Sequence, residues 1–329
     1  MRRYILAAAA AAILTTSAHA QQVRTAVNVV LFAGGNSMQI YVAQDKDFFA
    51  REGLTVNVRA TPSSGYQMQN MVNGQFDIAA TAIDNQIAYM EGQGTAKVDG
   101  KPDFITFMGG SSIELALMAQ PSIKTVAELK GKEFALDSVS TGFAFVLRRM
   151  LEKHGLGPND YKFVPAGGTR ERVIALREGR AAAALITEPF TTQLRQAGFS
   201  HLGEGLDVVG AYQGVVQIAN RSWAKANEDT IVRYIRAMIA ATDWIYNPAN
   251  REEAIKILAG RIRIPEAAAG PSVDGLVKGR APLARKGEID VEGVKTVIAL
   301  REQYSQPPVK LGAIETYVDL SYYRKAVGN

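Results

Sequence analysis

Cysteine is absent from this 329-residue chain, and histidine occurs only as His19, His154 and His201. The absence of cysteine excludes disulfides, thiol nucleophiles, cysteine ligands for a metal and a lipid-attachment cysteine. None of the three histidines is expected beside a nucleophile or a pair of carboxylates, so no catalytic site assembles from the sequence. We therefore predict a protein that is not an enzyme and has neither a cofactor nor a metal site.

Long hydrophobic runs are also lacking beyond the N-terminus. Arg2 and Arg3 precede an apolar run from Tyr4 to Leu14, and Ala18-His19-Ala20 is a cleavage pattern typical of a secretory signal peptide. The run is far shorter than the roughly 20 residues that span a bilayer. The sequence predicts a signal peptide over residues 1–20 and a mature periplasmic protein that begins at Gln21.

Neither sign of charge dominates the chain. The 37 basic and 32 acidic residues give a formal net charge of +5, and the excess is scattered. It could attract anions over long range, but it lacks the clustering typical of nucleic-acid binding. A hydrophobic content of 47% and a length of 329 residues indicate a globular protein that can hold two domains with full cores.

Two segments share one α/β pattern. In the first, predicted strands at 27–32, 55–58 and 76–80 alternate with helices that end near Gly53 and Gly74. In the second, strands at 134–136, 161–164 and 181–187 alternate with helices that end at Gly155 and Gly179. The loops that open these helices are rich in Ser, Thr and Gly, and they present free backbone N–H groups. The pattern predicts two α/β lobes that face a shared cleft.

The domain boundaries follow from where the chain is expected to cross between the lobes. We place the crossings near residues 119 and 213, with a return strand at 215–219. Lobe I then comprises residues 21–118 and 214–329, and lobe II comprises residues 119–213. Predicted helices at 223–246, 252–258 and 291–304 are expected to pack on lobe I.

Several strings in the chain are similar to a known family. YVAQDKDFFAREGLTV (41–56), SIKTVAELKGKEFAL (122–136), the segment 141–190, GEIDVEGVKTVIALREQY (287–304) and DLSYYRKA (319–326) resemble solute-binding proteins of ABC importers. The group is the nitrate/sulfonate/taurine family, which includes binders of thiamine-pyrimidine precursors. The resemblance implies a type II periplasmic-binding-protein fold, in which two α/β lobes joined by a two-segment hinge close over a ligand. The cysteine-rich motif and catalytic histidine of the family's synthase branch are absent here.

The candidate site consists of loops at the carboxyl ends of the predicted strands, where ligands of open α/β sheets bind. The expected ligand-binding residues are Phe32, Asn36, Ser37, Ser63, Ser64, Gln67, Thr81, Asp84, Asn85, Ser138, Ser140, Thr141, Gly142, Phe143, Gly168, Thr169, Arg170, Glu188 and Gln213.

Each polar candidate also has a structural interpretation. Ser138, Ser140 and Thr141 could bind an anionic head group or cap the following helix. Arg170 could grip a carboxylate or sulfonate in a bidentate fork, or it could be an exposed helix residue. Asp84 could cap a helix, or it could face the cleft and favour a ligand with an amine.

The predicted function is that of a periplasmic receptor that delivers a small organic anion, a sulfonate or an aromatic carboxylate, to an ABC permease in the inner membrane. Open alternatives are a binder of a thiamine-pyrimidine precursor or another heteroaromatic, an enzyme on the same fold, and a sensor domain of a membrane kinase. We expect a monomer that binds no nucleic acid.

Overall fold

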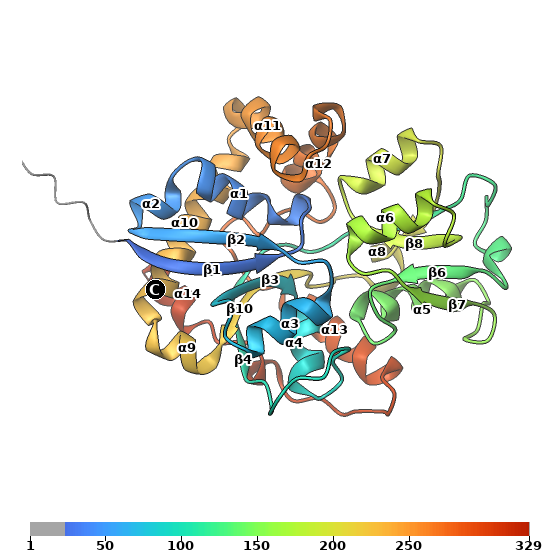
Figure 1. Cartoon of the computed structure of the whole chain (residues 1–329), viewed down its shortest axis with the longest axis horizontal. Coiled ribbons are helices and arrows are strands. Elements are labelled where there is room, and N and C mark those ends of the chain that lie inside the picture. The colour runs from blue at the N-terminus through green and yellow to red at the C-terminus, as the bar shows by residue number, and fades with distance from the viewer. Residues whose placement is uncertain (1–23, 329) are drawn as a thin grey trace, which may run out of the picture.

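Two five-stranded sheets form the centres of two lobes that lie side by side in the computed structural model (Figure 1). The structure describes residues 24–328. The predicted signal peptide and the predicted mature N-terminus at Gln21 lie outside the described residues.

The first lobe is built on a sheet with the strand order β2-β1-β3-β10-β4. β1 pairs in parallel with β2 and β3, whereas β10 runs antiparallel to both β3 and β4. The strands are β1 (Thr25–Leu31), β2 (Leu54–Ala60), β3 (Ile78–Ala82), β4 (Phe104–Gly109) and β10 (Val215–Asn220). The helices that connect them are η1 (Gly35–Ser37), α1 (Met38–Asp45), α2 (Phe48–Arg51), α3 (Ser64–Val72) and α4 (Ile83–Met90).

The second lobe repeats this plan with the strand order β7-β6-β8-β5-β9. Its strands are β5 (Ala116–Ala119), β6 (Glu133–Leu136), β7 (Lys162–Pro165), β8 (Ala183–Ile186) and β9 (Ser200–Glu204). Its helices are η2 (Ala127–Leu129), α5 (Gly142–Lys153), α6 (Thr169–Arg177), α7 (Phe190–Gln196) and α8 (Leu206–Val209). Every residue of β8 is buried, as expected for a central strand that is covered on both faces.

The first crossing between the lobes lies earlier than the sequence predicted. β5 pairs with β8 and β9 in the second sheet, so the chain crosses between Gly109 and Ala116 rather than near residue 119. The apolar run at 115–119 did not reveal this, because such a run shows that a strand is buried but not which sheet it joins. The return strand β10 begins at Val215, where the sequence places it.

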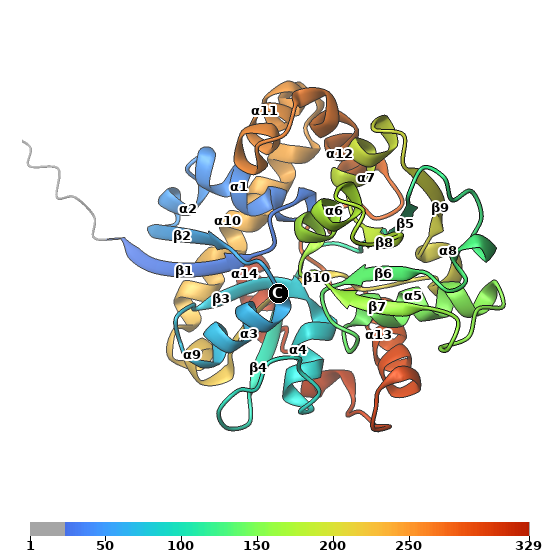
Figure 2. The same cartoon turned by 45° about the vertical axis from the view of Figure 1, so that its right-hand side comes forward.

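The C-terminal helices complete the first lobe and also touch the second. They are α9 (Arg221–Ala226), α10 (Glu228–Tyr246), η3 (Pro248–Asn250), α11 (Arg251–Ile262), α12 (Glu266–Lys278), α13 (Val291–Tyr304), η4 (Ile314–Thr316) and α14 (Ser321–Val327). α10 and α11 pack on α1, as expected, and α14 packs on α10. α12, however, contacts α7, and α13 contacts both α4 and α5 (Figure 2). The predicted helix at 291–304 therefore packs on lobe I at α4, and it also packs on α5 of lobe II. The sequence analysis did not predict α12.

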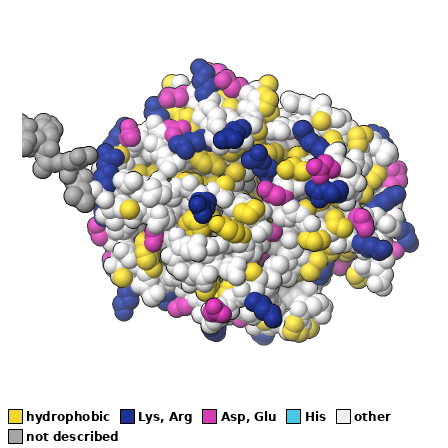
Figure 3. All heavy atoms as spheres, in the orientation of Figure 1, with side chains coloured by type: hydrophobic (Ala, Val, Ile, Leu, Met, Phe, Trp, Pro, Cys, Tyr) yellow, Lys and Arg dark blue, Asp and Glu magenta, His cyan; other side chains and the backbone are white. Residues whose placement is uncertain are grey.

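Within residues 24–328, no helix has both the length and the apolar character needed to cross a bilayer. Basic and acidic side chains are interspersed over the face of the molecule that Figure 3 shows.

Candidate functional site

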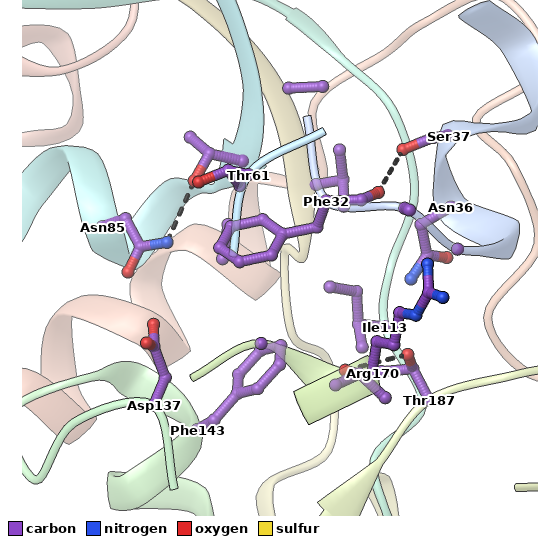
Figure 4. Close-up of a pocket in the computed structure, with 18 of the residues that line it drawn as sticks. Phe32, Asn36, Ser37, Thr61, Asn85, Ile113, Asp137, Phe143, Arg170 and Thr187 are labelled. Atoms are coloured by element: carbon purple, nitrogen blue, oxygen red, sulfur yellow. Dashed lines mark hydrogen bonds between the residues drawn. The ribbon is translucent and has the colours of Figure 1, made fainter. Parts of the chain in front are cut away.

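A cavity of about 280 Å³ lies between the two lobes. Its wall is formed by the segments that follow the carboxyl ends of β1, β2, β3, β6 and β8, together with the first turns of α5 and α6. Side chains from both lobes converge on it in Figure 4. The two α/β units thus bring their helix-opening loops to one place, as the repeated sequence pattern predicts.

Many of the predicted site residues lie on the cavity wall, and others do not. Those on the wall are Phe32, Asn36, Ser37, Thr81, Asp84, Asn85, Thr141, Gly142, Phe143, Gly168, Thr169 and Arg170. Those that do not line it are Ser63, Ser64, Gln67, Ser138, Ser140, Glu188 and Gln213.

The polar groups outside the wall have structural partners instead. Ser63 caps α3, because its side chain accepts a hydrogen bond from the backbone of Tyr66. The buried amide of Gln67 donates to the carbonyls of Val30 and Ala80, 3.3 and 3.1 Å away. Gln213 donates to the Ser111 carbonyl and accepts from the Asp290 backbone, which ties the hinge to the start of α13.

Ser138, Ser140 and Glu188 are likewise engaged within their own loops. The Ser138 and Ser140 hydroxyls lie 3.1 Å apart. The Glu188 carboxylate accepts hydrogen bonds from the Thr192 hydroxyl at 3.1 Å and the Thr192 backbone at 3.3 Å. Burial raises the pKa of Glu188 above its ordinary value. Thr141 has both interpretations at once, since it caps α5 and also faces the cavity.

Asp84 caps a helix, although the helix belongs to the other lobe. Its carboxylate accepts a hydrogen bond from the backbone N–H of Gly142, the first residue of α5. It also forms a bidentate ion pair with Arg301 of α13, with N–O distances of 2.8 and 2.7 Å. Both side chains are buried, and Arg301 donates a further bond to the Ser140 carbonyl. Asp84 therefore occupies the α5 N-terminus, which the sequence suggested for an anionic ligand.

Arg172 is the buried cation of the cavity wall, and the sequence analysis missed it. The residue is 2% exposed. Within residues 24–328 its only side-chain hydrogen bond runs from Nη2 to the Thr169 hydroxyl, at 2.8 Å, and its buried Nε has no partner. The guanidinium also lies 5.6 Å from the ring centroid of Phe143. Burial lowers the pKa of Arg172 to about 10, although the charges of Asp137 and Glu171 oppose the shift.

The position of Arg172 in the helix contains the signal that could have revealed it. Side chains in a helix lean toward its N-terminus, so a residue one turn inside α6 reaches the mouth of that helix. Arg170, in contrast, is exposed at the rim of the cavity, and its side chain extends toward Asn36 of the first lobe in Figure 4.

Other wall residues missed by the sequence analysis follow directly after strands. Thr61, Asp137 and Thr187 come immediately after β2, β6 and β8. The rule that ligands bind beyond strand ends covers these positions. The sequence analysis selected neighbouring residues of the same loops instead. Ile113 was missed because it lies in the first crossing between the lobes, which the sequence analysis placed near residue 119.

The lobes touch each other around the cavity. The Gly168 backbone donates to the Pro62 carbonyl at 2.9 Å, and the Ser64 backbone donates to Asp137 Oδ2 at 3.0 Å. Gly167 allows this approach, since its φ is +88° and a Cβ there would lie 2.8 Å from the Pro62 oxygen. The lobes are thus closed over the cavity in this structure.

No metal-binding arrangement is evident in the part of the chain that the structure describes. Among residues 24–328, no group of three or more His, Asp and Glu side chains could hold a metal ion. The cavity wall instead offers hydroxyls, amides, two arginines, two phenylalanine rings and the carboxylates of Asp84, Asp137 and Glu171.

Comparison with known proteins identifies the family. Residues 20–259 match the NMT1-like family. The chain belongs to this family. The fold of this NMT1-like protein is the two-lobed periplasmic-binding-protein fold, and the resemblance noted in the sequence is confirmed at this level.

Proteins similar to this NMT1-like protein in sequence or in structure include binding proteins from several bacteria. The putative binding protein YtlA of Bacillus subtilis is 26% identical over 66% of this chain and 65% of its own length, so the match spans less than two thirds of that protein. The nitrate-binding protein NrtA from Synechocystis PCC 6803 is 14% identical with a TM-score of 0.80, over 93% of this chain and 89% of its own. The aliphatic sulphonate binding protein SsuA from Escherichia coli is 22% identical with a TM-score of 0.62, over 85% and 90%.

Proposed function

We propose that this protein is a solute receptor of an ABC importer, which captures a small organic anion between its lobes and delivers it to a membrane permease. Its two-lobed fold and family membership support a binding role. NrtA and SsuA are named for nitrate and sulphonate, both anions. We propose a sulfonate or an aromatic carboxylate as the ligand.

The observation that most supports an anionic ligand is the buried guanidinium of Arg172 in the cavity wall. A guanidinium removed from water is costly unless an anion or several hydrogen bonds compensate for it. Within the described residues its side chain donates one hydrogen bond, to the Thr169 hydroxyl, and lies against the ring of Phe143. The charges of Asp137 and Glu171 favour the cation, but neither carboxylate accepts a hydrogen bond from it. An anionic ligand in the cavity would supply the missing partner, because a carboxylate or sulfonate accepts two parallel bonds from a guanidinium.

The test is calorimetric titration of ligand-free protein with alkanesulfonates, aromatic carboxylates and their neutral amide analogues. A charge-assisted hydrogen bond contributes about 1.5–3 kcal/mol, so Arg172→Met should weaken anion binding roughly tenfold or more. Arg177→Met is the matched control, because Arg177 is exposed in the last turn of the same helix. Failure of every anion to bind, or equal affinity in Arg172→Met, would refute the proposal.

A flat heteroaromatic such as a pyrimidine is the second candidate. The rings of Phe32 and Phe143, one from each lobe, point toward one another across the cavity in Figure 4, which suits a flat ligand. A neutral heteroaromatic should bind Arg172→Met as well as the wild type. Chromatography of the titrated compounds distinguishes a receptor from an enzyme, since a receptor returns its ligand unchanged.

A further inference from the structure

We propose that the ligand is an aromatic acid with a hydrogen-bond donor, such as a hydroxyl or amino group, on the part of its ring away from the acid group. The acid would lie at Arg172, and the donor would face Asp137 and Asn85. This inference rests on the proposed function and narrows its ligand class.

The acid end is defined by donors of α6 and the segment after β8. Arg172 lines this end and donates from Nη2 to the Thr169 hydroxyl, and its buried Nε has no partner within residues 24–328. The Thr187 hydroxyl lies 3.4 Å from that of Thr169, so the threonines form a continuous polar edge beside the guanidinium. The exposed Arg170 adds positive charge at the rim on this side of the cavity (Figure 4).

The other end presents acceptors. Asn85 donates its Nδ2 to the Thr81 hydroxyl at 2.9 Å, which fixes the amide so that Oδ1 is directed toward Asp137 (Figure 4). Asp137 uses Oδ2 to accept from the Ser64 backbone, and within residues 24–328 its Oδ1 accepts no hydrogen bond. Both oxygens are free to accept a hydrogen bond from a donor on a ligand that lies between them.

An anionic group is disfavoured at this acceptor end for two reasons. The N-terminus of α5, which would otherwise attract an anion, is already occupied by the carboxylate of Asp84. The Asp137 carboxylate would also repel a second anion placed beside it. On the α6 side the wall carries two cations, Arg170 and Arg172, and one carboxylate, Glu171. This balance favours an acid at α6, and it favours one acid group over two.

The middle of the cavity suits a flat apolar body. Phe32 and Phe143 lie between the Asn85–Asp137 side and the Arg170–Thr187 side in Figure 4, and Ile113 contributes a further apolar surface to the wall. Aromatic rings pack on one another with favourable geometry. A ring that carries its acid and its donor on different sides would contact both polar ends at once.

The experiment titrates ligand-free protein with benzoate, 3- and 4-hydroxybenzoate, 4-methoxybenzoate, 1,4-benzenedicarboxylate and butanesulfonate. We expect one hydroxybenzoate to bind about tenfold more tightly than the methoxy compound, since only the hydroxyl donates a hydrogen bond. The dicarboxylate should bind most weakly of the aromatic acids. Asp137→Ala should erase the preference for the hydroxyl, and Asn85→Ala serves as a second variant if Asp137→Ala does not fold.

Asp99→Ala is the matched control, because it removes the same charge from an exposed turn outside the cavity wall, and it should keep the preference. Equal binding of the hydroxy and methoxy compounds, or a preference that survives in Asp137→Ala, would overturn the inference. Arg172-dependent binding of butanesulfonate without binding of any benzoate would overturn the aromatic class and leave the receptor role intact. Failure of all the anions would overturn both proposals.

Discussion

Arg172 and Arg170 differ by two positions in α6 and have opposite environments. Arg172 is buried in the cavity wall, whereas Arg170 is exposed to solvent at the rim. Solvent screens an exposed charge, so Arg170 should contribute less to ligand affinity than the sequence analysis suggests. The glycine-rich loop before α6 shows where this helix begins. Whether an arginine in its first turn is buried depends on how α6 packs against Phe143 and β8, and the sequence of this segment does not reveal that packing.

The burial of Arg172 should cost stability while no ligand is bound. Its pKa is lowered to about 10 in the folded protein, so the unfolded chain binds the proton more tightly. The buried charge therefore lowers the free energy of unfolding at every pH below about 10. This destabilisation decreases as the pH rises through the pKa of Arg172 in the folded protein.

Arg172→Met should therefore stabilise the ligand-free protein at neutral pH, by roughly 1 kcal/mol or more, while it weakens anion binding. Urea denaturation at pH 7, with Arg177→Met as the control, measures the change. A lower free energy of unfolding in Arg172→Met would show that the guanidinium supports the fold rather than the ligand site.

At the scale of elements, α13 is connected to both lobes through one buried ion pair. Arg301 of α13 contacts Asp84 of α4 and the Ser140 carbonyl before α5. Tyr304 of the same helix stacks on Phe145 of α5, with ring centroids 6.0 Å apart. The helix therefore joins α4 and α5 behind the cavity.

Breaking this pair on one side should destabilise the protein strongly. Arg301→Met leaves the Asp84 carboxylate buried without its cation, a change that costs about 3–5 kcal/mol in other proteins. The double variant Asp84→Leu/Arg301→Met should recover most of the loss, because no buried charge remains. Thermal unfolding of the two single variants and the double variant measures the coupling. Additive losses would mean that the two residues do not act as a pair.

The elements were more predictable than their contacts. Apolar strands, glycine helix ends and Ser/Thr-rich loops follow local rules of period and turn chemistry, and these rules placed most helices and strands. The Asp84–Arg301 contact joins residues 217 positions apart, and no local pattern specifies such a partner. The same limit explains why β5 was assigned to the wrong lobe.

At the scale of the whole molecule, the lobes are closed over the cavity, and two segments connect them. These segments lie between β4 and β5 and between β9 and β10. Contacts such as Gly168 with Pro62 must open for a ligand to enter. Bending at the two connections is the simplest motion that separates the lobes.

Ligand binding should therefore make the protein more compact. Small-angle scattering should show a smaller radius of gyration when a bound anion saturates the ligand-free protein. Gly167→Val should reduce this change, because a side chain there meets the Pro62 oxygen and strains a backbone with φ of +88°. An unchanged radius of gyration in the wild type at saturation would show that the lobes do not move on binding.

Native mass spectrometry of the protein as purified, without added ligand, tests most directly whether the cavity holds an organic anion at Arg172. We expect the wild type and Arg177→Met to carry a small organic acid, and Arg172→Met to have lost it. The ligand's mass and its behaviour in negative-ion fragmentation identify its charge. Equal retention by Arg172→Met, or a bound ligand without an acid group, would contradict the account.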